Sequence, residues 1–455
     1  MSKESIVDYF ENQLDLSKNF DILKKEIYIN NKGIKLFYLT SLIDPIQFDY
    51  LMESLINNIP IKEIKVASVL ELKDLNTSLF FLFSGAVITF INNEVFAIDI
   101  RMYPTRSINE PDTEKGIRTS KDGFVETLIF NIALIRRRIK SNDLKVEHFI
   151  VSDISKSSVA LIYMDSMVDK SLLSNIKKEL QNININSLIM QEKALEETLF
   201  IKKEKIFPII KYSERPDVTS IQILNGKIAL LIDTSSVCLI LPCSLFDHLA
   251  HVEEYKESYI IGSFMRLIRS IGVLLSFILL PLFICLICDK DISNNIININ
   301  ISSKLITPIY IQVIFAYLIL EIIRIASLHS ISSYITSLSL LAALILGEIS
   351  FKLNIFSPEI LFIVAFTSIC NLATPSYELS LANRFVSIVL TILSLMFNYE
   401  GLLIGLIILF IHLVSIKSFN KPYLYPIVPF DLKEFKHLFI RKNSNDKKMH
   451  WKKIL

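Results

Sequence analysis

The sequence lacks most of the features that identify an enzyme or a secreted protein. It has five cysteines in 455 residues, an odd number, and three of them lie inside apolar runs, so no disulfide framework is expected. It contains no phosphate-binding loop, nucleophile elbow, HExxH motif or pair of CxxC motifs. We therefore predict no catalytic residues, no cofactor and no metal site, and expect a protein that is not an enzyme.

Two short motifs have metal-ligand or redox spacing, but a structural role is favoured for both. Cys285 and Cys288 stand at the end of an apolar run, without the βαβ context of a redox motif. His248 and His251 have helical metal-ligand spacing, yet a lone HxxH is more often a surface feature than a zinc site. A signal peptide is also missing from the charged N-terminus, which predicts that the first ~260 residues stay in the cytosol.

A strong excess of charge of one sign is absent as well. The formal net charge is +2, so there is no global electrostatic attraction to nucleic acid. What is abundant is apolar sequence: 51% of the residues are hydrophobic and the mean hydropathy is +0.46, too high for an ordinary soluble protein of this length. The excess lies after about residue 260, which predicts a domain embedded in a lipid bilayer.

The first half of the chain contains two similar stretches. Lys35–Leu55 and Ala160–Leu180 each combine an apolar strand, a serine, an aspartate (Asp44 or Asp169) and an amphipathic helix. This similarity predicts two related α/β subdomains.

A later hairpin recurs in the same order, at residues 84–100 and 225–241, and a glycine precedes the first strand each time. The alternative is that the similarity arises by chance, because strand and turn patterns of this kind are common. Since two blocks match and follow one another in the same order, we favour two related subdomains over chance.

Between the two copies, DGFVETLIFNIALIRRRIK (Asp122–Lys140) has the pattern of an amphipathic helix. Asp122 is expected to cap its start, and Glu126 is expected to lie in its first turn. One apolar stripe, predicted to pack onto a sheet, is formed by Phe124, Leu128, Ile132, Ile135 and Ile139.

Three consecutive arginines, Arg136, Arg137 and Arg138, flank that stripe. Such a run is most often a solvated face, and nucleic-acid binding would need interleaved aromatic residues or a recognised fold. The preceding loop supplies Glu110 and Glu114, whose carboxylates suit bidentate pairs with arginine. We predict that the arginines pair with acidic loops of the same or a neighbouring subunit, and that these five residues form a candidate subunit interface.

The second half contains six apolar runs. They cover Gly262–Ile287, Ile306–Ile325, Ile331–Ile349, Ile360–Leu372, Phe385–Phe397 and Leu402–Ile416. Basic and non-basic loops alternate between them, which favours six crossings with both termini inside. Ile360–Leu372 and Phe385–Phe397 are shorter than the ~20 residues of a full span, so five crossings with a broken or re-entrant segment is the alternative.

Polar residues within these runs are candidates for an ion path, because each is costly in a bilayer unless it is paired or faces water. They are Gln312, Glu321, Arg324, Glu348 and Asn371. Glu321 and Arg324 stand three residues apart and can neutralise each other, so we favour a structural pair for them over an ion path.

The predicted fold is an α/β cytosolic region of two related subdomains followed by an all-α multi-pass membrane domain. The expected boundaries are 1–145 for the first subdomain with its connecting helix 122–140, 146–258 for the second, 259–418 for the membrane domain and 419–455 for a basic cytosolic tail.

Several long blocks of the chain resemble one family. The blocks include YPTR, SKDGFVETLIFN, YSERPDVTSIQILNGKIALLID, ATPSYELSLANR and KSFNKPYLYPIVPF. Together they resemble the A subunits of bacterial spore germination receptors, the GerA family, from about Tyr28 to Arg441. Gln312 and Tyr317 stand where nutrient-receptor A subunits commonly have acidic residues, which weakens the transfer of an acidic ion path.

The resemblance implies a multi-pass protein of the spore inner membrane, with its α/β subdomains in the cytosol. Family A subunits are thought to oligomerise into a cation-conducting channel. The implied partners are therefore further copies of this chain, other membrane germination proteins and the lipid bilayer, with no nucleic acid. Several blocks are most similar to a branch whose members support or amplify germination. A non-conducting membrane scaffold is the alternative function.

Overall fold

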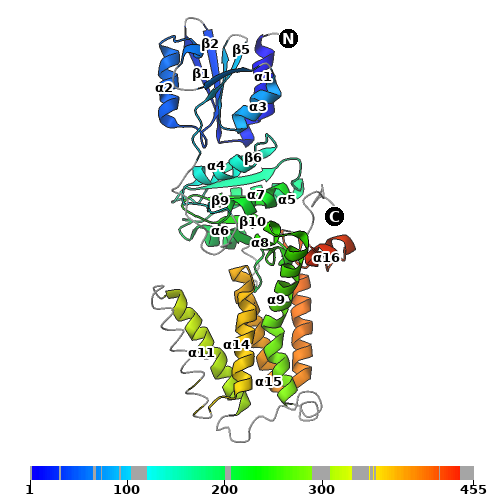
Figure 1. The fold of residues 1–455 in the computed structure, drawn as a ribbon. Helices are drawn as coiled ribbons and strands as arrows, with labels where there is room; N and C mark the ends of the chain where they lie inside the picture. Colours follow the sequence, from blue (N-terminus) through cyan, green and yellow to red (C-terminus); the bar gives the residue numbers. More distant parts are fainter. Residues whose placement is uncertain are drawn as a thin grey trace.

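Two α/β units and a bundle of long helices follow one another along the molecule (Figure 1). The structure is a computed structural model. It describes residues 3–29, 32–64, 68–72, 74–91, 94–103, 120–199, 206–288, 308–329, 348, 352, 355–419 and 421–440.

The first α/β unit is built on an antiparallel sheet of five strands in the order β1-β2-β4-β5-β3. The strands are β1 (Ile22–Ile29), β2 (Lys32–Leu39), β3 (Ser68–Leu72), β4 (Val87–Ile91) and β5 (Glu94–Asp99). Helix α2 (Pro45–Ile56) covers one face of the sheet, while α1 (Lys3–Leu14) and α3 (Leu75–Phe83) cover the other. Alternating side chains of the strands therefore enter two separate hydrophobic cores.

The second unit has the sheet order β6-β7-β9-β10-β8. Its strands are β6 (Leu144–Val151), β7 (Ser157–Met164), β8 (Lys211–Ser213), β9 (Ile228–Ile232) and β10 (Cys238–Leu241). Helices α5 (Lys170–Asn182) and α6 (Gln191–Leu199) contribute to the core on one face. Helices α4 (Leu128–Arg138) and α7 (Pro216–Leu224) contribute to the core on the other.

The two units have the same topology, which confirms the predicted pair of related subdomains. Corresponding strands occupy corresponding places in the two sheets. Asp44 caps α2 by accepting from the backbone N–H of Ile46 at 2.9 Å, and Asp169 caps α5 by accepting from that of Ser171 at 3.0 Å. Gly85 precedes β4 and Gly226 precedes β9, both with positive φ (100° and 86°), a conformation that glycine adopts without strain.

The start of the arginine-rich helix differs from its prediction. Helix α4 begins at Leu128, and the expected N-cap role of Asp122 is wrong. The segment before Leu128 is held by tertiary hydrogen bonds instead: the N–H of Phe124 donates to the carbonyl of Glu214 at 2.8 Å, and the N–H of Leu128 donates to the carboxylate of Asp233 at 3.2 Å. These partners lie far away in the sequence, so local helix signals give no sign of them.

The apolar stripe of α4 packs as predicted. All five of its members are buried in the core between α4, α7 and the sheet of the second unit. By packing, residues 124–139 therefore belong to the second unit, whereas the predicted boundary at residue 145 assigns them to the first.

The helical region contains α9 (Tyr259–Cys288), α11 (Ile309–His329), α14 (Pro358–Leu372) and α15 (Tyr377–Ser415). Three of them, α9, α11 and α15, are long and apolar enough to cross a membrane. Gln312 near the start of α11 accepts from the N–H of Ser357 immediately before α14, so α11 and α14 begin at the same end of the bundle. The predicted run 331–349, apart from Glu348, lies outside the described residues.

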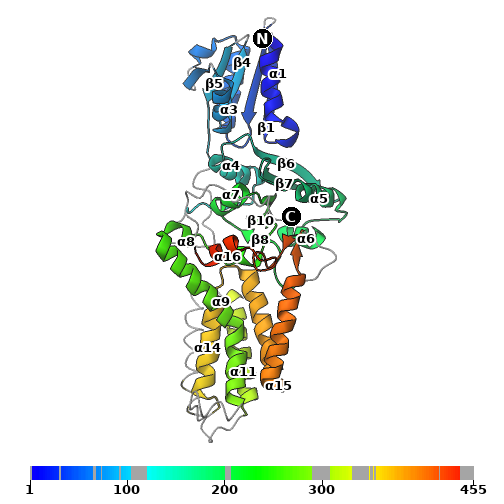
Figure 2. The same cartoon turned by 90° about the vertical axis from the view of Figure 1, so that its right-hand side faces the viewer.

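Helix α15 is a hairpin of two arms that turns at Asn398, where the backbone is not helical (φ 51°, ψ −134°). In a straight helix Leu390 and Gly405 would lie about 22 Å apart. Instead, a Cβ placed on Gly405 would lie 2.5 Å from a methyl carbon of Leu390. The two arms lie side by side in both views (Figure 2) and correspond to the predicted runs Phe385–Phe397 and Leu402–Ile416.

The close approach of the arms leads to a first prediction. A Cβ on Gly401 would clash with the backbone carbonyl of Leu393, which cannot move without breaking its helix. We expect Gly401→Ala to lower the stability of the full chain by about 1–3 kcal/mol, measured as a lower thermal unfolding midpoint in detergent. Gly33→Ala is the control, because its Cβ would only meet Tyr28 at 3.4 Å. Equal midpoints for the two variants would contradict the hairpin.

After the second arm, the chain returns to the second α/β unit. The short hairpin of β11 (Lys417–Ser418) and β12 (Lys421–Pro422) brings Ser418 beneath that unit, where its hydroxyl donates to the carbonyl of Ile209 at 2.8 Å. The Lys421 ammonium lies 3.0 Å from Asp169. A hydrogen bond from the Ser171 hydroxyl and then this ammonium lower the pKa of Asp169 to about 2. The second unit and the bundle therefore share buried contacts.

Candidate functional sites at the subdomain junction and in the helical bundle

The junction between the two α/β units is centred on Arg136, whose side chain is fully buried. Its Nε and Nη2 donate to the two carboxylate oxygens of Asp21, both at 2.9 Å, and Nη2 also donates to Asn19 at 2.9 Å. Its Nη1 donates to the carbonyl of Leu144 at 2.9 Å, and the guanidinium lies over the ring of Phe83 at 5.3 Å. Arg136 thus joins α4 and β6 of the second unit to α3 and the segment directly before β1 of the first.

This position changes the predicted role of Arg136. The side chain is enclosed within one chain, so it is not available to a neighbouring subunit. The expected acidic partner exists, but it is Asp21 of the same chain. Sequence patterns do not indicate this pair, because Asp21 lies 115 residues before Arg136.

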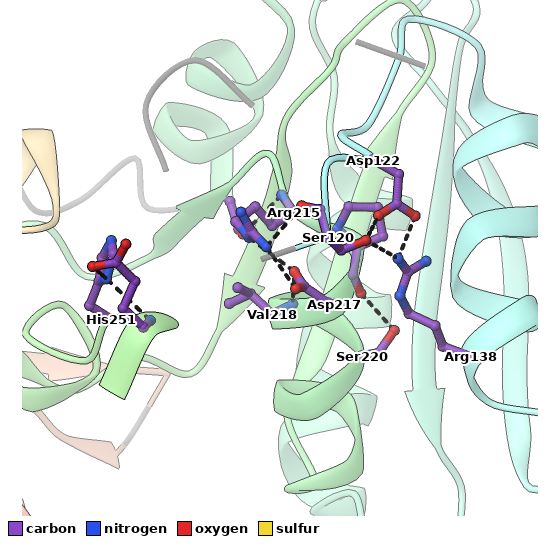
Figure 3. A network of polar contacts seen from close by, with 11 residues as sticks. Ser120, Asp122, Arg138, Arg215, Asp217, Val218, Ser220 and His251 are labelled. Atoms are coloured by element: carbon purple, nitrogen blue, oxygen red, sulfur yellow. Dashed lines mark hydrogen bonds and ion pairs between the residues drawn. The ribbon is translucent and has the colours of Figure 1, made fainter. Parts of the chain in front are cut away.

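Arg138 belongs to a second polar cluster, which holds the segment before α4 (Figure 3). Its guanidinium donates to Asp122 and, at 3.3 Å, to the hydroxyl of Ser120. On the other side of Ser120, the buried Arg215 donates to the Ser120 carbonyl at 3.2 Å and pairs with Asp217 at 2.7 Å. The cluster therefore fixes residues 120–122 against the start of α7.

Arg137 is the exposed member of the three. Its guanidinium lies 5.1 Å from the ring centroid of Tyr103, a cation–π contact. Glu110 and Glu114, the predicted acidic partners, lie outside the described residues. Of the three arginines, only Arg137 is exposed enough to remain a candidate for the subunit interface.

A second junction joins the α/β region to the helical bundle through His248. This side chain is buried, with Nε2 3.2 Å from the carbonyl of Pro208 and Nδ1 3.1 Å from the hydroxyl of Ser376, the N-cap of α15. Because a carbonyl only accepts, the bond to Pro208 places the proton of the neutral ring on Nε2. Burial and then the positive charge of Lys211 lower the pKa of His248 to about 3.

The lowered pKa of His248 predicts that acid weakens this junction. The imidazole has a pKa of about 6.5 in the unfolded chain and about 3 in the folded one. The contribution of the neutral side chain to the free energy of unfolding is therefore fully present above pH 6.5 and is lost as the pH falls toward 3. At pH 5 the loss is on the order of 2 kcal/mol. We expect the thermal unfolding midpoint of the full chain to fall between pH 7 and pH 5, and His248→Gln to flatten that dependence. An equally steep fall in the variant would contradict this assignment.

In the helical bundle, Glu321 lies between two arginines. Its carboxylate accepts from Arg324 at 2.8 Å on the same helix and from Arg384 at 2.6 Å on the first arm of α15. The hydroxyl of Tyr317 lies 3.4 Å from the backbone carbonyl of Arg384. The structure thus contains the predicted Glu321–Arg324 pair and extends it to Arg384, which the sequence analysis did not connect with it.

The other predicted polar residues hold helix ends or are exposed. Gln312 is buried, and its amide oxygen accepts from the N–H of Ser357 at 2.8 Å. Asn371 donates to the carbonyl of Ser380 at 3.3 Å, which links the end of α14 to the start of α15. Glu348 is 64% exposed and lies 3.4 Å from Lys352. These contacts do not bring the five candidates together into one continuous path.

Metal binding has no support in the part of the chain that the structure describes. Within those ranges, no group of three or more histidine, cysteine, aspartate or glutamate side chains is placed to hold an ion. His248, one half of the HxxH motif, uses its nitrogens on Pro208 and Ser376 as described above.

A duplicated α/β region joined to helices of membrane-spanning length is the architecture of a membrane protein with a large extramembrane part. The family model described as "Bacillus/Clostridium GerA spore germination protein" matches residues 8–452. The chain belongs to this family.

Individual relatives are proteins of sporulation and spore germination. Stage V sporulation protein AF of Bacillus subtilis (strain 168) is 35% identical over 449 residues, which cover 95% of this chain and 91% of that protein. Spore germination protein KA of the same organism is 28% identical over 74% of this chain and 62% of its own length. The crystal structure of the N-terminal domain of the A subunit of the Bacillus megaterium spore germinant receptor GerK3 aligns at 23% identity and a TM-score of 0.40, over 52% of this chain and 92% of that one.

Proposed function

We propose that the protein is a membrane subunit of an oligomeric complex in the spore inner membrane that triggers or amplifies germination by conducting ions. The observation that supports this most directly is the family match over nearly the whole chain, both the α/β region and the helices. In this proposal the α/β units lie in the cytosol and the protein is not an enzyme. Its partners are further copies of the chain and other membrane germination proteins.

The buried contacts at the two junctions support a role for the α/β region in transmitting a signal. Arg136 links the first unit to the second, and His248 links the second to the N-cap of α15. In this proposal, a change in contacts between subunits in the α/β region reaches the helices through these two junctions. Such coupling requires two discrete arrangements of the linked parts, each favoured by a different partner.

A non-conducting scaffold is the second candidate, and one observation favours it. The polar residues predicted to form an ion path are engaged within the chain, as in the Glu321 cluster and the Gln312–Ser357 bond. A scaffold needs such groups only for helix packing. Under this alternative, spores whose protein carries Glu348→Leu germinate normally, and disrupting contacts of the α/β region abolishes germination.

Arg137 offers a test of the proposed assembly that leaves the fold intact. Because its guanidinium is exposed, Arg137→Glu is expected to weaken oligomerisation of the full chain without lowering its thermal unfolding midpoint. The measurement is the mass of the complex in detergent. The matched control is Lys140→Glu, a nearby exposed cation. An oligomer of normal size in Arg137→Glu, or equal loss in both variants, would count against an interface at Arg137.

A further inference from the structure

A cavity of about 450 Å³ lies where the helical bundle meets the α/β region. Its walls come from α9, both arms of α15 and the segment that contains α16 (Leu432–Phe439). Figure 2 shows α16 at this level, across the α/β end of the bundle. The volume is within the range of small-molecule and cofactor sites, and the cavity is separate from the polar clusters described above.

The lining of the cavity is divided into an apolar part and a polar end. The apolar part is formed by Val273, Leu274, Phe277, Val386, Phe410 and Leu413. The polar end, where α9 meets α16, is formed by Arg266, Glu434 and His437, and Arg266 is paired there with the buried Glu254 at 2.7 Å. Asn383 lines the cavity from the first arm of α15. Arg266 also donates to the backbone carbonyl of His437 at 2.8 Å, which ties α16 to α9. A ligand that fits this division has a long apolar portion and a polar head.

The side-chain amide of Asn383 is buried and its nitrogen has no hydrogen-bond acceptor among the described residues. The residue is only 3% exposed. Buried amide donors without a partner are rare, because desolvation of the group is not offset. His437 Nδ1 is likewise buried and has no partner within the described part of the chain. Both residues line the same cavity, and a rotation of either side chain toward it would bring its nitrogen next to an oxygen of a bound ligand.

The cavity opens on the side that a bilayer would cover. Leu274 of α9 and Phe410 of the second α15 arm both line it, and they are 53% and 52% exposed. Leu274 belongs to a helix of membrane-spanning length and Phe410 to an apolar arm of the α15 hairpin, so the surface around this opening is in contact with lipid once the bundle is in a membrane. An occupant that enters here comes from the bilayer, whose lipids combine acyl chains with ester carbonyls and a phosphate.

We propose that this cavity binds one bilayer glycerophospholipid, with an acyl chain along the apolar walls and an ester carbonyl accepting from Asn383. The phosphate lies at the polar end, beside Arg266 and His437. The lipid joins α16, α9 and α15 and thereby stabilises the end of the bundle next to the α/β region.

The test is native mass spectrometry of the full chain released from nanodiscs of phosphatidylglycerol. We expect one lipid to remain bound per chain. Leu413→Trp, which fills the apolar part, is expected to lose it. Asn383→Leu is expected to reduce retention about tenfold, the equivalent of one hydrogen bond. The matched control is Ile408→Trp on the same arm, which does not line the cavity and is expected to retain the lipid.

Three outcomes would overturn the proposal. One is wild-type protein that is folded but retains no lipid. Another is equal retention in all four proteins, which would mean a nonspecific lipid shell. The third is a change of oligomer size in Leu413→Trp with lipid retention unchanged, which would mean that a second copy of the chain covers the cavity. If Leu413→Trp does not fold, lipid retention by Asn383→Leu is the deciding measurement. This variant is expected to fold, because leucine is close in size to asparagine and has no amide that needs a partner.

Discussion

Replacing Arg136 by methionine is expected to open the junction between the two α/β units. The substitution removes a bidentate ion pair and leaves the Asp21 carboxylate buried without a counter-charge. Breaking a buried pair in this way costs about 3–5 kcal/mol. Local opening free energies are measured by hydrogen exchange of the full chain. The N–H of Phe20, which donates to Val146 across the junction at 3.1 Å, should exchange at least about a hundredfold faster.

Arg137→Met is the matched control for this experiment, since it changes the neighbouring residue in the same way. Arg137 is exposed, so the exchange of Phe20 should stay close to that of the wild type. A double variant, Arg136→Met with Asp21→Leu, should recover part of the protection because no buried charge remains. Equal exchange in Arg136→Met and Arg137→Met would show that the buried pair does not hold the units together.

Replacing Glu321 by glutamine is expected to destabilise the helical bundle. The carboxylate is the acceptor for both Arg324 and Arg384, so its loss leaves two neighbouring guanidinium groups without the negative charge between them. The side chain of Glu321 is 24% exposed, so the expected cost of about 1–3 kcal/mol is below that of a fully buried pair. The measurement is the thermal unfolding midpoint of the full chain in detergent.

Glu348→Gln is the matched control, because it makes the same chemical change in the same part of the chain. The Glu348–Lys352 pair is 64% and 71% exposed, and exposed pairs contribute little to stability. Its midpoint should remain that of the wild type. A similar fall in both variants, or none in Glu321→Gln, would contradict the structural role of the three-residue cluster.

The duplicated fold could be predicted because its signals are local. Each copy has an aspartate that caps a helix directly after a strand, and a glycine directly before a hairpin. The residue types at these positions are required by the backbone conformation within a few residues: a side-chain acceptor at the helix N-cap and a glycine where φ is positive. The stripe of α4 followed from helical periodicity in the same way.

Features that depend on distant partners were missed. Asp122 has the sequence of an N-cap, but its carboxylate binds Arg138 and the helix begins six residues later, where Asp233 accepts from Leu128. The burial of Arg136 depends on Asp21 in the other unit. No periodic pattern marks Asp233 or Asp21 as a partner. The sequence alone therefore shows that these residues are charged, but not that they pair with distant groups or are buried.

In the helical bundle, the sequence indicated two apolar runs but not the sharp turn between them. Asn398 has φ 51° and ψ −134°, which lies outside the left-handed helical region that asparagine tolerates, so its residue type does not mark the turn. The close packing of Gly401 and Gly405 against the first arm supports the hairpin, yet two glycines in an apolar run are equally compatible with a continuous helix. Arg384 could be seen as a loop charge, and its pairing with Glu321 follows only from the way α11 lies against α15.

Ion conduction is the central claim of the proposed function, and a planar bilayer recording tests it most directly. The purified full chain, together with any membrane proteins that co-purify with it, is added to a bilayer that separates solutions of different monovalent salt concentration. The proposed channel predicts a cation current that requires the oligomer and is reduced by Arg137→Glu. An intact oligomer that passes no current with any combination of partners would contradict conduction and leave the scaffold as the function.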